Sequence, residues 1–130
     1  MNTKVCLKWA EALESGKYQQ GTEALRVEHP DGSTTYCAFG VLCDLYDIIM
    51  VQPNDGTLWS KTGHGTYTYA RFDYSTMCPV TLWAGLTDEE LVSTVIDMND
   101  SKGWRKQTPF VEIAEYVRLR VEIHNMDGRE

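Results

Sequence analysis

The sequence lacks long hydrophobic runs, and it has fewer basic residues than acidic ones. No stretch approaches the roughly 20 apolar residues that a membrane-spanning helix needs, and Lys8 and Glu11 interrupt the apolar pattern near the N-terminus. Lys and Arg number 12 against 19 Asp and Glu, which gives a formal net charge of -7. Binding to the phosphate backbone of nucleic acid needs a net positive surface. We therefore expect a soluble cytoplasmic protein without a signal peptide that binds neither membranes nor nucleic acid.

Closely spaced cysteine pairs are also missing. The four cysteines are Cys6, Cys37, Cys43 and Cys78. A structural zinc site uses ligand pairs only a few residues apart, and Cys37 and Cys43 would point in different directions on a helix. We predict no metal site and no cofactor, and we expect free thiols in a reducing compartment.

Apolar periodicity predicts helices at both ends of the chain. The N-terminal stripe, which ends before Ser15-Gly16, is formed by Cys6, Trp9, Ala10 and Leu13. The C-terminal stripe, which follows a helix start at Thr108-Pro109, is formed by Phe110, Ile113, Ala114, Val117 and Val121. Between them, Thr87 and Glu90 have the spacing of a capping box that would begin another helix.

Strand patterns lie between these helices. Residues 24–28 and 34–36 predict a hairpin around the turn at 29–33. Residues 48–76, rich in Gly, Thr, Tyr and Trp, predict two or three short strands or an insertion loop. The aromatic residues Trp59, Tyr67, Tyr69 and Phe72 would form an exposed face for a partner or ligand. We predict an α+β fold: a single small domain over residues 1–125 with a short antiparallel sheet, followed by a polar tail at 126–130.

The segment from Tyr36 to Tyr46 is apolar on nearly every side, so a helix here must be buried at the centre of the fold. Cys37 would begin this helix, where the helix dipole would lower the thiol pKa. With His64 it would resemble the catalytic pair of a cysteine hydrolase. No third orienting group is evident, so we predict no catalytic residue, and we favour a non-enzymatic protein with Cys37 as a small buried hydrophobe.

A candidate ligand site lies in the loops beside this helix. Tyr18, Gln20 and Arg26 are close together in the sequence. The Arg26 guanidinium offers a fork of donors suited to phosphate or carboxylate, and an aromatic ring can stack on a flat base. The alternative is that Arg26 pairs with Glu28 or Asp44 and that Tyr18 only covers the core.

Further along the chain, Asn99 and Asp100 follow a predicted helix. Their ordinary role is to end that helix and shape the turn. If the site binds a nucleotide-like ligand, Gln20, Asn99 and Asp100 would contact its ring edges or ribose hydroxyls. Tyr18 or Trp104 would stack on the base.

Several blocks of sequence resemble, in order, a family of small phage-encoded proteins. They have the pattern KWxxAL, SGKYxQG, LR, YC, GVLCDLY, WAGL, ND and FxEIA, and Cys37-Ala38 stands where members often have two cysteines. The resemblance implies a viral accessory protein acting in a host cytoplasm against a host defence. The implied role is to bind and sequester a small anionic nucleotide-like signal, for which a homo-oligomer would enclose the ligand better. The alternatives are a protein-binding inhibitor of a host factor and a Cys37-dependent hydrolase.

Overall fold

The computed structural model describes residues 1–100 and 106–126 and has the α+β fold that the sequence predicts. Its α-helices are α1 (Thr3–Glu14), α2 (Ala38–Tyr46), α3 (Gln52–Asp55), α4 (Pro79–Ala84), α5 (Glu89–Asn99) and α6 (Phe110–Met126). A π-helical segment, η1 (Asp47–Val51), and a 3-10 turn, η2 (Gly63–Gly65), complete the helical elements. Its strands are β1 (Gln19–Gln20), β2 (Arg26–Glu28), β3 (Thr34–Tyr36), β4 (Trp59–Lys61) and β5 (Thr66–Tyr69).

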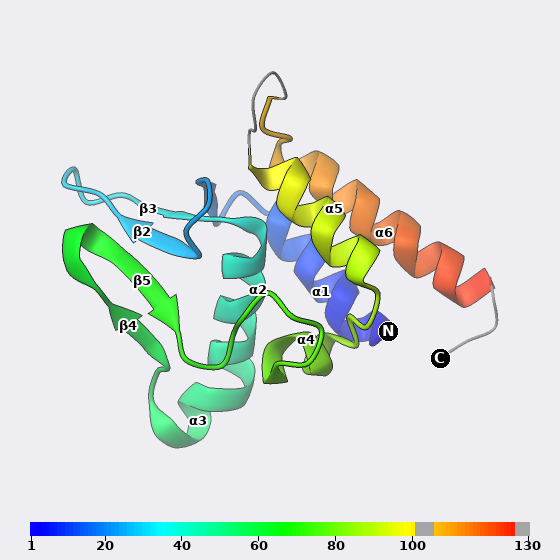
Figure 1. Ribbon diagram of the computed structural model, residues 1–130, viewed down its shortest axis with the longest axis horizontal. Helices are drawn as coiled ribbons and strands as arrows, with labels where there is room; N and C mark the ends of the chain where they lie inside the picture. Colours follow the sequence, from blue (N-terminus) through cyan, green and yellow to red (C-terminus); the bar gives the residue numbers. More distant parts are fainter. Residues whose placement is uncertain (101–105, 127–130) are drawn as a thin grey trace.

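Helix α2 lies between the sheet and the layer formed by α1, α5 and α6 (Figure 1). It buries every residue of its first two turns, Ala38, Phe39, Gly40, Val41, Leu42 and Cys43. Helix α1 packs most extensively against α6 and also contacts α2. The expected buried central helix and the two flanking amphipathic helices are therefore confirmed.

The sheet has the strand order β1-β3-β2-β5-β4. The central pairs are antiparallel, as expected, and the two-residue β1 adds one parallel pair with β3. Arg26 of β2 lies opposite Tyr36 on one side and opposite Tyr67 on the other. Because directly paired residues project from the same face of a sheet, this register brings the three side chains together.

Two sequence-based details are wrong. Helix α5 is capped by Asp88 rather than Thr87, because the Asp88 side chain accepts hydrogen bonds from the N–H groups of Glu90 and Leu91. The expected exposed aromatic face is also absent, since Trp59 and Tyr69 are only 8% and 3% exposed. Both rings pack toward the C-terminal end of α2, where carboxylates accept hydrogen bonds from them.

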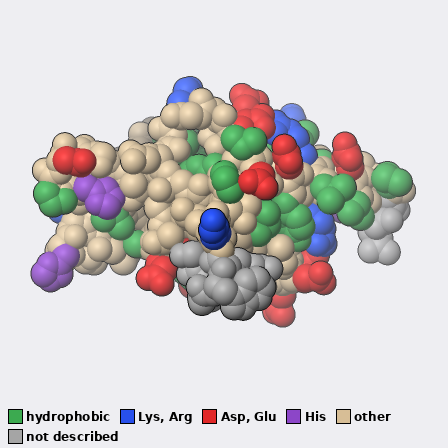
Figure 2. Space-filling model, turned by 90° about the horizontal axis from the view of Figure 1, so that it is seen from above, with side chains coloured by type: hydrophobic (Ala, Val, Ile, Leu, Met, Phe, Trp, Pro, Cys, Tyr) green, Lys and Arg blue, Asp and Glu red, His purple; other side chains and the backbone are tan. Residues whose placement is uncertain are grey.

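The described surface carries charges of both signs. Figure 2 shows acidic and basic side chains scattered over one face, with hydrophobic side chains visible among them. None of the helices in residues 1–100 and 106–126 has the length and apolar character required to cross a bilayer.

Candidate functional site

Arg26 lies among three aromatic rings on one face of the sheet. Its guanidinium carbon is 4.3 Å from the ring centroid of Tyr67, 5.5 Å from that of Trp59 and 5.8 Å from that of Tyr36. These distances are within the range of cation–π attraction. We call these four residues the Arg26 cluster. The pairing of β2 with β3 and β5 creates it, because alternate residues of paired strands share a face.

The Arg26 side chain has no hydrogen bond or ion pair with any residue in the described part of the chain, and its Nε is fully buried. The nearby Glu28 carboxylate instead accepts hydrogen bonds of 3.1 Å from Lys61 Nζ and from Tyr67 Oη. The hydrogen bond from Lys61 is the main cause that lowers the pKa of the Glu28 carboxyl. Arg26 therefore forms no direct ion pair with Glu28, although its positive charge also helps to lower the pKa of the Glu28 carboxyl.

Asp44, the other proposed partner of Arg26, is also engaged elsewhere. Its carboxylate accepts a 2.6 Å hydrogen bond from Tyr18 Oη and a 3.2 Å hydrogen bond from Trp59 Nε1. Burial and the neighbouring carboxylate raise the pKa of the Tyr18 phenol, so this group stays a hydrogen-bond donor at neutral pH. Through Tyr18, Asp44 connects the Arg26 cluster to the loop before β1.

A groove of about 360 Å³ adjoins this loop, between α1 and η1. Tyr18 and Leu45 contribute flat and apolar surface to it, and the exposed side chains of Lys8, Lys17 and Glu11 also line it. The Tyr18 ring meets Tyr36 of the Arg26 cluster edge-on, with centroids 5.0 Å apart. The groove and the cluster are therefore neighbours that share the Tyr18–Tyr36 contact.

The structure gathers Gln20, Asn99 and Asp100 in a separate network. Asn99 Oδ1 accepts hydrogen bonds from the Ala38 N–H at 3.1 Å and from Gln20 Nε2 at 3.2 Å. Gln20 Oε1 accepts from the Phe110 N–H at 3.0 Å, and Asp100 Oδ1 accepts from the Glu23 N–H at 2.8 Å. Polar groups of all three side chains thus bind other parts of the fold. Their ligand roles stay predictions, and Trp104 lies outside the described residues.

The aromatic partners of Arg26 were not identified from the sequence. The sequence placed Tyr36 both in the return strand of the hairpin and at the start of the buried segment, and Trp59 and Tyr67 on an exposed face. The hairpin predicted around residues 29–33 could have identified one of these partners, because it places Arg26 opposite Tyr36. The pairing with Tyr67 had no local signal, since β2 and β5 are far apart in the sequence.

Cys37 is buried, as the favoured interpretation predicts, and it is not the reactive thiolate that the hydrolase alternative requires. Cys37 is the N-cap of α2, where its Sγ accepts a 3.4 Å hydrogen bond from the Gly40 N–H. Burial raises the pKa of the Cys37 thiol, and this effect outweighs the N–H groups of the helix start. His64 is exposed in η2, at the tip of the β4–β5 hairpin and away from the start of α2 (Figure 1). The two residues therefore do not form a catalytic pair.

The Arg26 cluster, the Tyr18 groove and the Asn99 network all lie within residues 1–121, which match one family model, Domain of unknown function (DUF8296). The chain belongs to this family. The DUF8296 match begins before α1 and ends inside α6, so it covers the sheet and the central helix. No curated protein and no solved structure matches the chain.

Proposed function

We propose that this DUF8296 protein binds and sequesters a small anionic, nucleotide-like molecule, and that Arg26 contacts the anionic group. The observation that carries the proposal is the Arg26 guanidinium, which is held by three aromatic rings and has no hydrogen bond to a described residue. A buried donor without a partner is unfavourable and calls for an explanation. An anionic ligand would accept hydrogen bonds from Nη1 and Nη2 at the other end of the guanidinium, because only Nε is fully buried.

The chemistry of the guanidinium supports an oxyanion in particular. Rings that lie over a guanidinium leave its N–H donors available in the plane of the group. A phosphate or carboxylate accepts hydrogen bonds from that edge, often two at once. The carboxylates of Glu28 and Asp44, which could compete for this edge, both already accept hydrogen bonds from other donors.

The groove beside Tyr18 supports the nucleotide-like part of the proposal. A base can stack on the Tyr18 ring, and Lys8 and Lys17 supply positive charge in a protein whose net charge is -7. In this arrangement, the phosphate contacts Arg26 and the base lies in the groove. The hydrogen bond to Asp44 fixes the Tyr18 ring before the ligand arrives, which limits the entropy lost on binding.

A sequestering role follows from the resemblance to phage-encoded accessory proteins together with the absence of a reactive Cys37–His64 pair. Binding alone is enough to lower the free concentration of a signalling molecule, so no catalytic group is required. The role in countering a host defence rests on that resemblance.

Isothermal titration calorimetry against cyclic dinucleotides and cyclic ADP-ribose isomers tests this proposal, using protein refolded from denaturant to remove copurified ligand. We expect at least one compound to bind saturably. Arg26→Gln should weaken its binding at least tenfold, and Arg26→Lys should restore only part of the affinity because lysine keeps the charge but loses the planar fork.

The matched control is Arg118→Gln, which removes another arginine that forms an ion pair with Glu14 on the helical side of the protein. It should bind like the wild type. Circular dichroism would verify that each variant is folded. No heat with any compound in the panel, or equal binding by folded Arg26→Gln, would refute the proposal.

A second function, inhibition of a host protein, is favoured by one surface feature. Ile48, Ile49 and Met50 are consecutive, and they are 48%, 42% and 47% exposed. They belong to the π-helical η1, and such segments occur frequently at functional sites. Ile48 and Ile49 also line the Tyr18 groove, so a host protein bound here would compete with the nucleotide. Met50 does not line the groove, so Met50→Lys should abolish capture of the host protein while leaving nucleotide binding unchanged.

A further inference from the structure

The Arg26 cluster lies among carboxylates as well as aromatic rings. Glu28, two residues further along β2, projects from the same face of the sheet, and the charge of Arg26 helps to lower the pKa of its carboxyl. On the side of α2, Asp44 accepts a hydrogen bond from Trp59, which is one of the three rings around the guanidinium. Two carboxylates that form no ion pair with Arg26 therefore lie close to its charge.

The other cation on this face of the sheet is already engaged. Among the described residues of the five strands, Arg26 and Lys61 are the only cationic side chains. Lys61 Nζ donates to Glu28 at 3.1 Å, and Tyr67 Oη donates to the other oxygen of the same carboxylate. The charge of Lys61 is thus offset by Glu28. Arg26 supplies the one positive charge that a ligand can use on this face of the described strands.

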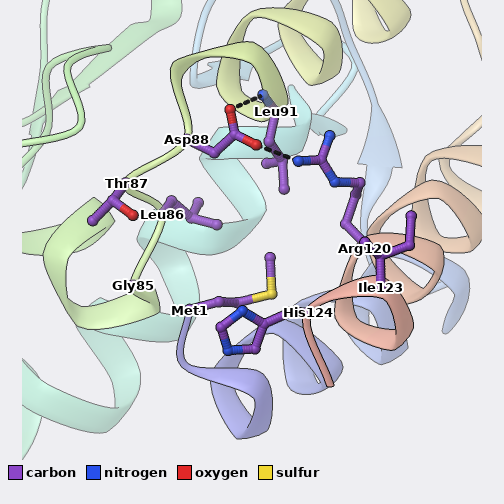
Figure 3. A pocket seen from close by; sticks show the side chains of 9 residues that line it. All are labelled: Met1, Gly85, Leu86, Thr87, Asp88, Leu91, Arg120, Ile123 and His124. Carbon is purple, nitrogen blue, oxygen red and sulfur yellow. Dashed lines mark hydrogen bonds and ion pairs between the residues drawn. The ribbon is translucent and has the colours of Figure 1, made fainter. Parts of the chain in front are cut away.

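Arg120 shows how a guanidinium is held when a carboxylate compensates its charge. It lines a cavity of about 300 Å³ between the α4–α5 connection and α6, where its Nη2 pairs with Asp88 and its Nη1 donates to Tyr116 Oη at 3.1 Å. In Figure 3 this guanidinium points toward Asp88 and away from His124. Arg26 has no such partner in the described part of the chain, so its charge stays available to a ligand.

The accessible end of the Arg26 guanidinium suits a phosphodiester. Its Nε is fully buried, which leaves Nη1 and Nη2 to donate. A phosphodiester shares one negative charge between two non-bridging oxygens, and arginine commonly donates two parallel hydrogen bonds to such a pair of oxygens. A phosphomonoester has three terminal oxygens and a charge of about −1.5 to −2 at pH 7. Its second charge would be close to Glu28 and Asp44 rather than to a second free cation, which is unfavourable.

We propose that the Arg26 site selects singly charged phosphodiesters, such as the phosphate of a 3′,5′-cyclic nucleotide, over doubly charged phosphomonoesters. This selectivity rests on the nucleotide-binding function proposed above and adds the charge state of the ligand. Arg26 attracts the first negative charge, and Glu28 and Asp44 repel the second. Specificity can come from an unfavourable interaction with the wrong ligand, so no further attractive contact with the right one is required.

Isothermal titration calorimetry with matched pairs of nucleotides tests the selectivity. Each pair is the 3′,5′-cyclic monophosphate and the 5′-monophosphate of adenosine, guanosine, cytidine or uridine. At pH 8, at least one cyclic nucleotide should bind saturably and at least tenfold more tightly than its 5′-monophosphate. At pH 5.5 the monoester has lost most of its second charge, because the second phosphate pKa is about 6, so this affinity ratio should fall at least threefold. The cyclic nucleotide keeps one charge at both pH values and therefore reports any effect of pH on the protein itself.

A variant removes one of the two repelling carboxylates. Glu28→Gln should tighten the binding of the 5′-monophosphate at least threefold at pH 8, and it should change the binding of the cyclic nucleotide by a smaller factor. Glu115→Gln, the same substitution on the exposed face of α6, is the matched control and should alter neither affinity. Circular dichroism would verify that both variants are folded.

The possible failures of the selectivity and of the proposed function are distinguishable. Equal or tighter binding of the 5′-monophosphate at pH 8, weakened by Arg26→Gln, would overturn the selectivity and leave the proposed function standing. An affinity ratio that is the same at both pH values would also overturn it, because charge would then not be what distinguishes the two esters. Absence of binding by every cyclic nucleotide would overturn the selectivity, and the proposed function fails with it if the cyclic dinucleotides and cyclic ADP-ribose isomers give no heat either.

Discussion

At the scale of single residues, Asp47 is the most constrained charged group in the described part of the protein. It is 0% exposed, and its carboxylate accepts hydrogen bonds from four donors. These donors are Gln52 Nε2 at 2.9 Å, Thr57 Oγ1 at 2.8 Å, the Leu58 N–H at 3.0 Å and Tyr69 Oη at 2.9 Å. Burial alone would raise the pKa of the Asp47 carboxyl, but these donors together lower it below its ordinary value.

We predict that Asp47→Asn lowers the free energy of unfolding at pH 7 by about 2–4 kcal/mol, because the amide nitrogen would face donors and leave some of them unpaired. The lowered pKa means that the wild-type stabilisation is complete above the unfolded-state value of about 3.9 and is lost as the pH falls through the folded-state value. The difference between wild type and variant should therefore shrink in acid.

Urea unfolding at pH 7 and at acidic pH measures both effects. Glu115→Gln, an exposed substitution on α6, is the control and should change stability by no more than about 0.5 kcal/mol. If Asp47→Asn were as stable as the wild type at pH 7, the four hydrogen bonds would not contribute to the free energy of unfolding.

The sequence could identify Arg26 as a candidate but not Asp47. Arg26 is distinctive because a fork of donors in a predicted strand has an evident ligand chemistry. Asp47 follows an apolar segment, and three of its donors belong to a loop and a strand whose position depends on tertiary packing. Sequence patterns report periodicity along one element, so they do not show which distant donors converge on one carboxylate.

At the scale of elements, the packing of α2 depends on Gly40. A Cβ built on Gly40 would lie 1.8 Å from the Leu25 carbonyl oxygen, far inside any allowed contact. Gly40 therefore allows the helix to approach the chain that leads into β2. Gly40 is needed here because it has no side chain, and not because its backbone conformation is unusual for a helix.

We predict that Gly40→Ala destabilises the protein by about 1–3 kcal/mol, the usual cost of overpacking. Helix propensity alone would predict the opposite, a gain of about 1 kcal/mol. The sign of the change thus distinguishes the two effects in a chemical denaturation experiment. Gly63→Ala is the matched control, because nothing lies near a Cβ at Gly63, and it should be nearly neutral. A stabilised Gly40→Ala variant would contradict the close approach.

Elements with a long repeating pattern were predicted well, and so was the short β2–β3 hairpin, but the two-residue β1 was not. The apolar stripes identified α1 and α6, and the central apolar run identified α2, because each buries a face long enough to leave a pattern. Strand β1 has only two residues and forms by pairing in parallel with β3, so it has no pattern of its own. The cap of α5 was placed one residue too early, since Thr87 and Asp88 are both good caps and only the tertiary structure selects one.

At the scale of the whole molecule, Asn99 connects parts of the chain that are distant in sequence. Its Nδ2 donates to the Gly21 carbonyl at 3.1 Å, and its Oδ1 accepts from the first residue of α2 and from Gln20. Gln20 in turn binds the Thr108 carbonyl and the Phe110 N–H at the start of α6. Sequence reasoning considered Asn99 as a helix end or a ligand contact, and neither interpretation included this connection between the sheet and three helices.

We predict that Asn99→Asp lowers the free energy of unfolding by about 2–4 kcal/mol, because a second carboxylate oxygen would replace the Nδ2 donor and face the Gly21 carbonyl and Asp100. Since Asn99 joins the sheet to α2, α5 and α6, the loss should appear in one cooperative transition. Tryptophan fluorescence and far-ultraviolet circular dichroism should then give the same midpoint. Asn54→Asp, on the exposed surface of α3, should leave stability nearly unchanged. Separate midpoints for the two probes would mean that Asn99 stabilises only its own turn rather than the fold as a unit.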